Sequence, residues 1–216
     1  MKKSRFSIGI LFFICGLNFA TWATRIPDFK SFLGLSDAQL GTVLMGLPIG
    51  SLVSLPIAGW LLTKYASRWI CIIAVAMYVI VIPSLSLLSS AISLFIGLFF
   101  FGMAGDIMNI AMNTQVVSLE AKMNKIIMSS FHAIFSIGLM AGAFLGGYLE
   151  KENFSPFEHF SIIACLNIAL VPFIFGNLLT DKPVQDENKP ASSILNLGPY
   201  LIVLSLIAFC GMLCEG

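Results

Sequence analysis

The feature that most constrains this chain is a run of 51 residues, 69–119, in which only one residue, Asp106, is charged. A membrane-spanning helix needs about 20 mostly apolar residues, so this run is long enough for two spans. In lipid every backbone N–H and C=O group must be bonded inside the protein, and a helix satisfies them all within one segment. The run therefore predicts an all-α membrane protein.

The same length criterion predicts seven spans along the whole chain. A segment at 180–193 interrupts them with five charges and two prolines, and is typical of a cytoplasmic linker. The sequence thus predicts a six-helix bundle at 1–179, the linker, and the start of a second bundle at 194–216, where the seventh helix is truncated. The predicted spans are 6–25, 38–62, 69–88, 91–118, 126–149, 157–179 and 194–214.

Two of the predicted spans begin with a capping signal. Ser36 and Gln39 have the spacing of a capping box, in which each side chain bonds the other residue's backbone N–H group. Ser155 and Glu158 repeat this pattern, with Pro156 between them at the first helical position. These signals support helix starts near residues 37 and 156.

Composition excludes several classes of function. The chain is 58% hydrophobic and 11% charged, and its net charge of +1 argues against a nucleic-acid partner. The five cysteines lie within apolar runs, without the spacing of a metal site, so we expect neither metal nor cofactor. No arrangement of Ser, His and Asp indicates a catalytic site, and we do not expect an enzyme.

The positive residues predict the orientation in the membrane. If the N-terminus is cytoplasmic, nine of the twelve Lys and Arg residues lie in cytoplasmic segments and three lie outside. Because cytoplasmic loops carry an excess of positive charge, this distribution favours a cytoplasmic N-terminus.

Asp106 is the strongest functional candidate. A carboxylate at the centre of a span costs about 3 kcal/mol and usually marks a polar pathway. Asn109 and Asn113 follow at i+3 and i+7, so the three side chains share one face of a helix. We interpret this stripe as the wall of a water-filled cavity in a transport protein. The alternative is a neutral carboxyl that bonds a neighbouring helix.

The polar and small residues repeat every three helices. Asn18, Thr21, Trp22 and Arg25 form a polar stripe on the first predicted helix, which corresponds to the stripe on the fourth. The second and fifth helices share GxxxG spacing, which lets helix backbones approach closely. This pattern predicts a three-plus-three inverted repeat, as in secondary transporters. The spacing occurs at Gly46/Gly50 and at Gly138/Gly142/Gly146.

The segment 59–68 (GWLLTKYASR) resembles the signature of the major facilitator superfamily between its second and third helices. Gly59, Lys64 and Arg68 match that signature, whereas Thr63 replaces its acidic residue and Ala66 its second glycine. The resemblance implies that Lys64 and Arg68 act in gating, and the missing acid argues against a charge relay there.

Three further segments are similar to the branch that contains fucose–proton symporters and uncharacterised bacterial inner-membrane relatives. They are 22–28 (WATRIPD), 35–41 (LSDAQLG) and 105–113 (GDIMNIAMN), and 130–132 (SFH) also fits. The resemblance implies a twelve-helix fold of which this chain is the N-terminal half, with helices one and four lining the cavity. It also implies that Asp106 matches the membrane carboxyl used for proton coupling.

These observations assign an expected role to each candidate residue. Asp106 carries the proton, and four residues contact the substrate, although the amides could instead bond neighbouring helices. Arg25 and His132 lie at a cavity mouth or gate, although Arg25 could instead extend to the outer interface and His132 could be interfacial, as we expect for His159. The expected substrate-binding residues are Asn18, Trp22, Asn109 and Asn113.

The sequence therefore predicts part of a secondary transporter in a bacterial inner membrane. It would move a small polar solute together with protons by alternating access, and the resemblance and the amide-rich stripe suggest a sugar-like solute. Its expected partners are the lipid bilayer, the solute, the proton, and a missing C-terminal half or a second copy. The alternative is a membrane remnant or helix-packing scaffold that does not transport.

Overall fold

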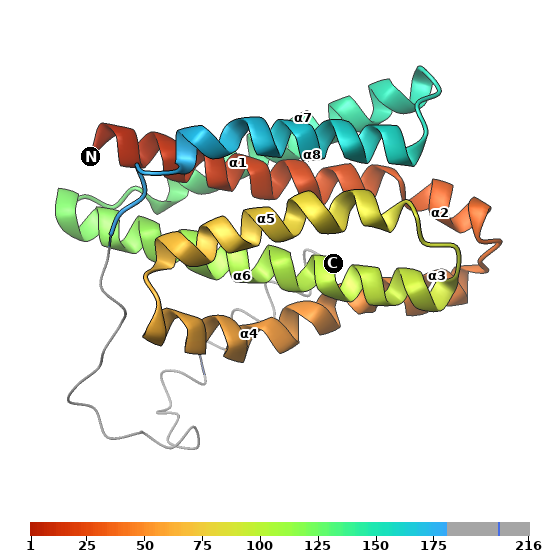
Figure 1. Ribbon diagram of the computed structural model, residues 1–216, viewed down its shortest axis with the longest axis horizontal. Coiled ribbons are helices and arrows are strands. Elements are labelled where there is room, and N and C mark those ends of the chain that lie inside the picture. The colour runs from red at the N-terminus through yellow and green to blue at the C-terminus, as the bar shows by residue number, and fades with distance from the viewer. Residues whose placement is uncertain (181–202, 204–216) are drawn as a thin grey trace. The chain divides into compact units, whose positions relative to one another are not determined.

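A computed structural model describes residues 1–180 and Val203 of the chain (Figure 1). In residues 1–180 the regular elements are all α-helices, and they provide six segments long and apolar enough to cross a membrane. The predicted linker and seventh span lie outside the described residues, apart from Thr180 and Val203. The helices are α1 (Lys2–Thr24), α2 (Ile26–Phe32), α3 (Asp37–Leu44), α4 (Gly46–Lys64), α5 (Ser67–Leu85), α6 (Ala91–Met123), α7 (Met128–Lys151) and α8 (Pro156–Ile174).

Two of the six spans are interrupted by a single residue. Arg25 separates α1 from α2, and Met45 separates α3 from α4. In each case a proline, Pro27 or Pro48, follows within three residues. Proline has no N–H group, and its ring clashes with the carbonyl of the preceding turn. The prolines thus account for both interruptions. The first coincides with the predicted end of the span 6–25, whereas the second lies inside the predicted span 38–62 and was not expected.

The largest differences from the predicted helix ends are at α6 and α8. The helix α6 continues to Met123, five residues beyond the predicted end, and its 33 residues are about 50 Å long. The helix α8 stops at Ile174, five residues early, because Pro172 removes a backbone donor and Gly176 has a positive φ of 89°.

The predicted capping boxes are both confirmed. Ser36 accepts a hydrogen bond from the backbone of Gln39 at the start of α3, and Ser155 accepts one from Glu158 at the start of α8. In both boxes the second side chain also bonds the backbone N–H of the serine. These local signals fixed the helix starts independently of tertiary packing.

The main helix pairs are formed by spans that do not follow each other in the sequence. The first helix α1 packs mainly against α7, whereas α4 packs mainly against α6, which also lies beside α5 (Figure 1). In span numbering, the first span pairs with the fifth and the second with the fourth. If the first three spans are exchanged with the last three, each of these two pairs becomes the other, as a three-plus-three repeat requires. The inverted repeat itself stays a prediction.

Glycines allow these two pairs to approach closely. A Cβ atom on Gly50 of α4 would overlap with the carbonyl oxygen of Phe99 in α6, and one on Gly138 of α7 would overlap with that of Phe13 in α1. Both glycines belong to the GxxxG patterns, so the prediction of close helix contact there is confirmed. The backbones are near enough for direct van der Waals contact, which drives helix association in lipid.

Replacement of Gly138 by alanine should therefore force α1 and α7 apart. We expect the free energy of unfolding in detergent micelles to fall by about 1–3 kcal/mol, the usual cost of overpacking. Gly147→Ala is the matched control on the same helix, because nothing lies within 4 Å of a Cβ atom there. Equal stability of the two variants would contradict the assignment of Gly138 to the helix contact.

Candidate functional site

Asp106 lies on α6 and contacts α4. The hydroxyl Oγ of Ser54 lies 2.6 Å from Oδ2 of Asp106 and 2.7 Å from the carbonyl oxygen of Ser51. Ser54 is fully buried, and Asp106 is partly buried. The carboxyl is thus anchored to a neighbouring helix on one side, as the alternative interpretation expected, and is not fully enclosed.

The two asparagines of the predicted stripe contact each other. Nδ2 of Asn113 donates to Oδ1 of Asn109 at 3.0 Å, and the side chain of Asn109 is exposed. Oδ1 of Asn113 is buried and has no hydrogen-bond partner among the described residues. The stripe on α6 therefore presents one exposed amide, next to a buried acceptor without a partner among the described residues.

The polar stripe of α1 lies inside the bundle. Asn18 is fully buried, donates to the carbonyl of Ile14 at 2.7 Å and accepts from Nδ2 of Asn167 in α8 at 2.8 Å. Trp22 is 2% exposed, and its ring packs against those of Phe29 and Phe101. These side chains make interhelical contacts, which was the alternative interpretation for the amides.

This placement differs from the prediction that both stripes face one cavity. Helical periodicity shows which residues share a face, but it does not show which neighbour covers that face. The helix α1 is part of the most buried of the six spans, and beyond its first two turns its exposed positions are Phe19 and Ala23 instead. Asn18 and Trp22 accordingly do not lie on a surface open to solute in this structure.

Arg25 connects the junction of α1 and α2 to the start of α8. Its Nε donates to Nδ1 of His159 at 3.0 Å, and its two terminal nitrogens bond Asp28 Oδ2 at 2.9 Å and the carbonyl of Phe154 at 3.0 Å. Arg25 is 2% exposed and His159 is fully buried. Both side chains thus lie inside the bundle, near the ends of their helices, and a gating or interfacial role of Arg25 stays a prediction.

The other residues that were predicted to act in gating lie at the opposite end of the bundle from the network of Arg25. The amino group of Lys64 lies 4.3 Å from the ring centre of Trp60, and Arg68 lies 5.0 Å from that of Trp69. His132 is exposed, with its ring edge-on to Phe12. None of the three forms an ion pair within the described part of the chain, and their roles stay predictions.

Sequence reasoning did not identify Ser54 and Asn167 as partners of the candidate residues. Serine is common in apolar helices, so nothing in its spacing distinguishes Ser54 from Ser51. Asn167 interrupts an apolar run, and such an amide in lipid signals a hydrogen-bond partner without identifying it. Among residues 1–180 and Val203, no three His, Cys, Asp or Glu side chains lie close enough to hold a metal ion.

Comparisons with known proteins agree on one family. The model of the Major Facilitator Superfamily matches residues 8–214. An uncharacterized MFS-type transporter of Yersinia pestis is 32% identical over 212 residues, which cover 97% of this chain and 54% of that protein. An uncharacterized transporter of Sinorhizobium fredii is 30% identical over 95% of this chain and 54% of its own length. The chain spans about half the length of the curated relatives it matches.

Solved structures show the same fold. A crystal structure of the nucleoside transporter NupG matches with a TM-score of 0.68 at 20% identity, over 91% of this chain and 49% of that one. A NupG mutant matches with a TM-score of 0.70 at 16% identity, over 94% and 50% of the two chains. The predicted fold class, an all-α membrane bundle of the facilitator type, is confirmed.

Replacement of Arg25 by lysine tests the network at the start of α8. Lysine keeps the charge but cannot bond three partners in the fixed geometry of a guanidinium group. We expect the free energy of unfolding in micelles to fall by about 2 kcal/mol, because hydrogen bonds of a buried charged group are lost. Arg5→Lys is the control on the same helix, and a loss of equal size there would contradict the assignment.

Proposed function

The chain belongs to the Major Facilitator Superfamily, and on this premise we propose that it forms one six-helix half of a secondary transporter for a small polar solute. Such transporters work by rocking two bundles about a site near the middle of the membrane. A second bundle, from the rest of a longer protein or from another copy, would complete the site. The half-length match to the curated relatives supports this composition.

The observation that carries the proposal is the open polar stripe on α6. Asp106, Asn109 and Asn113 all lie within an otherwise uncharged span, and Asn109 is exposed on the isolated bundle. Polar side chains at this depth face protein or a water-filled cavity rather than lipid. We therefore place the second bundle, with the transport pathway between the two, on the side of α6 that carries this stripe.

Proton coupling at Asp106 follows from the bonds of Ser54. The single hydroxyl proton of Ser54 has two acceptors within reach, the Asp106 carboxylate and the carbonyl of Ser51. When Asp106 is ionised, Ser54 donates to it. When Asp106 is protonated, it donates to Ser54, and the hydroxyl then turns to Ser51. Gain of a proton thus changes the contact between α4 and α6 without leaving a buried group unpaired.

The stripe also indicates the class of solute. The free Oδ1 atom of Asn113 accepts a hydrogen bond, and the exposed amide of Asn109 offers a further donor. A small solute that bears hydroxyl or N–H groups matches both, and a sugar-like solute remains our first candidate. Asn18 and Trp22 would act indirectly, because Asn18 holds α1 against α8 and Trp22 holds it against α6.

The second bundle has two available helix faces. The helices α4 and α7 are the least buried of the six spans and carry large exposed apolar side chains. On α7, Met140, Phe144 and Tyr148 follow at helical spacing and are each more than half exposed. We propose that these faces, on either side of the polar stripe, contact the second bundle.

A scaffold or remnant that does not transport is the second candidate. The Ser54–Asp106 contact favours it in one respect, because a buried hydrogen bond can serve only to join α4 to α6. The two candidates predict different effects of replacing the carboxyl of Asp106 by an amide. An amide can still bond Ser54, but it cannot carry a proton.

Asp106→Asn should therefore abolish pH-driven uptake while it preserves folding. In a full-length protein that contains this chain, we expect uptake of labelled sugars or nucleosides under an imposed pH gradient to fall to the level of empty liposomes. Exchange of solute without a gradient should persist. Glu152→Gln, the same chemical change at an exposed position, is the control. Uptake that keeps its full pH dependence in Asp106→Asn would contradict proton coupling at Asp106, whereas no uptake by the unmodified full-length protein would support the scaffold.

The 216-residue chain by itself should not transport. One bundle supplies only one wall of the pathway, so we expect no saturable uptake into liposomes by the purified chain. Co-reconstitution with the second half of the full-length protein should restore it. Robust saturable uptake by the chain alone, with a mass that shows a monomer, would contradict the two-bundle proposal.

A further inference from the structure

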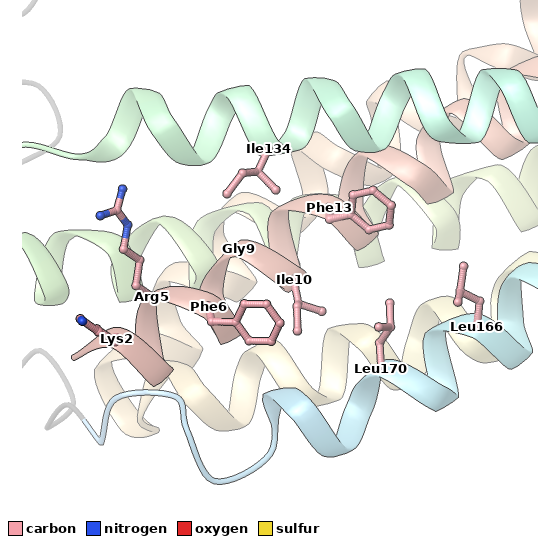
Figure 2. A pocket seen from close by; sticks show the side chains of 9 residues that line it. All are labelled: Lys2, Arg5, Phe6, Gly9, Ile10, Phe13, Ile134, Leu166 and Leu170. Carbon is pink, nitrogen blue, oxygen red and sulfur yellow. The ribbon is translucent and has the colours of Figure 1, made fainter.

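We propose that the groove between α1, α7 and α8 binds one anionic phospholipid, with its phosphate on Lys2 and Arg5 and an acyl chain along the groove. Figure 2 shows this groove, a cavity of about 660 Å³, with the two basic side chains at one end. The remaining lining is apolar and comes from all three helices. It includes Phe6, Ile10, Phe13, Ile134, Leu166 and Leu170.

The dimensions of the groove fit an acyl chain. From Lys2 to Phe13 the helix α1 rises about 16 Å. The hydrocarbon region of one leaflet is about 15 Å thick, half of the full bilayer core. The groove therefore begins at the level of the head groups and extends about as deep as the leaflet. Its volume lies within the range of roughly 300–1,000 Å³ that is typical of small-molecule sites.

The charges at the head-group end match an anion. Lys2 and Arg5 are exposed, and neither forms an ion pair within the described part of the chain. Lys2 also lines a second hollow together with Lys3, Phe6 and Phe173, so its side chain lies where two hollows meet. A phosphate group would give both cations a partner, with charge-assisted hydrogen bonds from the guanidinium of Arg5.

The surroundings make a lipid a better occupant than a second copy of the chain. Because the helices alternate in direction, the ends of α4 and α6 lie on the same side as Lys2 and carry further basic residues. The one carboxylate on that side among residues 1–180, Glu120, already accepts two backbone hydrogen bonds at the start of α7. A second copy in the same membrane orientation would bring basic ends together, whereas anionic lipids are attracted by such clusters.

Native mass spectrometry of the delipidated chain, titrated with phosphatidylglycerol or phosphatidylcholine, tests the head-group site. We expect one phosphatidylglycerol to bind preferentially. Removal of one charge near the membrane surface should weaken this binding about 5-fold, so Lys2→Gln/Arg5→Gln should weaken it about 25-fold. Lys122→Gln/Lys125→Gln, at the exposed end of α6 and the following loop on the same side, should leave it unchanged. No preference in the original chain, or equal losses in both variants, would overturn the proposal.

A second pair of variants tests the groove itself. Leu170→Trp places a bulky ring in the cavity, and Ile168→Trp places it on an exposed part of the same helix that does not line the cavity. We expect only the first to reduce phosphatidylglycerol binding, with helix content by circular dichroism unchanged in both. Equal binding by both variants would overturn the proposal, as would displacement of the lipid by soluble glycerol phosphate or a dimer that forms in its place.

Discussion

The close contact between α4 and α6 determines where the candidate proton site lies. Gly50 and Gly102 each lie against the backbone of the opposite helix, and Ser54 and Asp106 follow one turn later on each side. A larger residue at either glycine would separate the helices, and the hydroxyl would then no longer reach the carboxyl. The distance between the hydroxyl and the carboxyl is thus set by the glycine contacts, which leave no room for a larger side chain, and not by the polar groups themselves.

The two polar stripes differ in exposure. On α1 the stripe is buried, and Asn18 and Arg25 bond to residues of α8, so the stripe stabilises the arrangement of α1 and α8. On α6, Asn109 is exposed, and Asp106 and Asn113 are partly buried. Unpaired acceptors do not distinguish the stripes, because Thr21 on α1 and Asn113 on α6 each have one buried oxygen without a partner among the described residues. The exposure of the α6 stripe is therefore the basis of the proposal that α6 faces the pathway.

Much of the fold is encoded locally and was predictable from the sequence. The spans follow from runs of apolar residues, the starts of α3 and α8 from capping boxes, and the close contacts of α4 and α7, although not their partners, from glycine spacing. The orientation of α1 was not predictable, because periodicity defines a face without defining its neighbour. For the same reason Ser54 and His159, whose partners are 52 and 134 residues away, gave no signal in the sequence.

The bonds of Arg25 have a consequence for the order in which the bundle is made. Its partner His159 is synthesised 134 residues later, which takes about 10 s at typical rates of translation. The partner of Asn18 is synthesised later still, because Asn167 is 149 residues away. The first span therefore leaves the ribosome with its amide and guanidinium groups paired only locally, with Ile14 and Asp28, and α8 completes their hydrogen bonds. Until then water or the insertion machinery must shield these groups, and a nascent chain that lacks α8 would expose them to quality control.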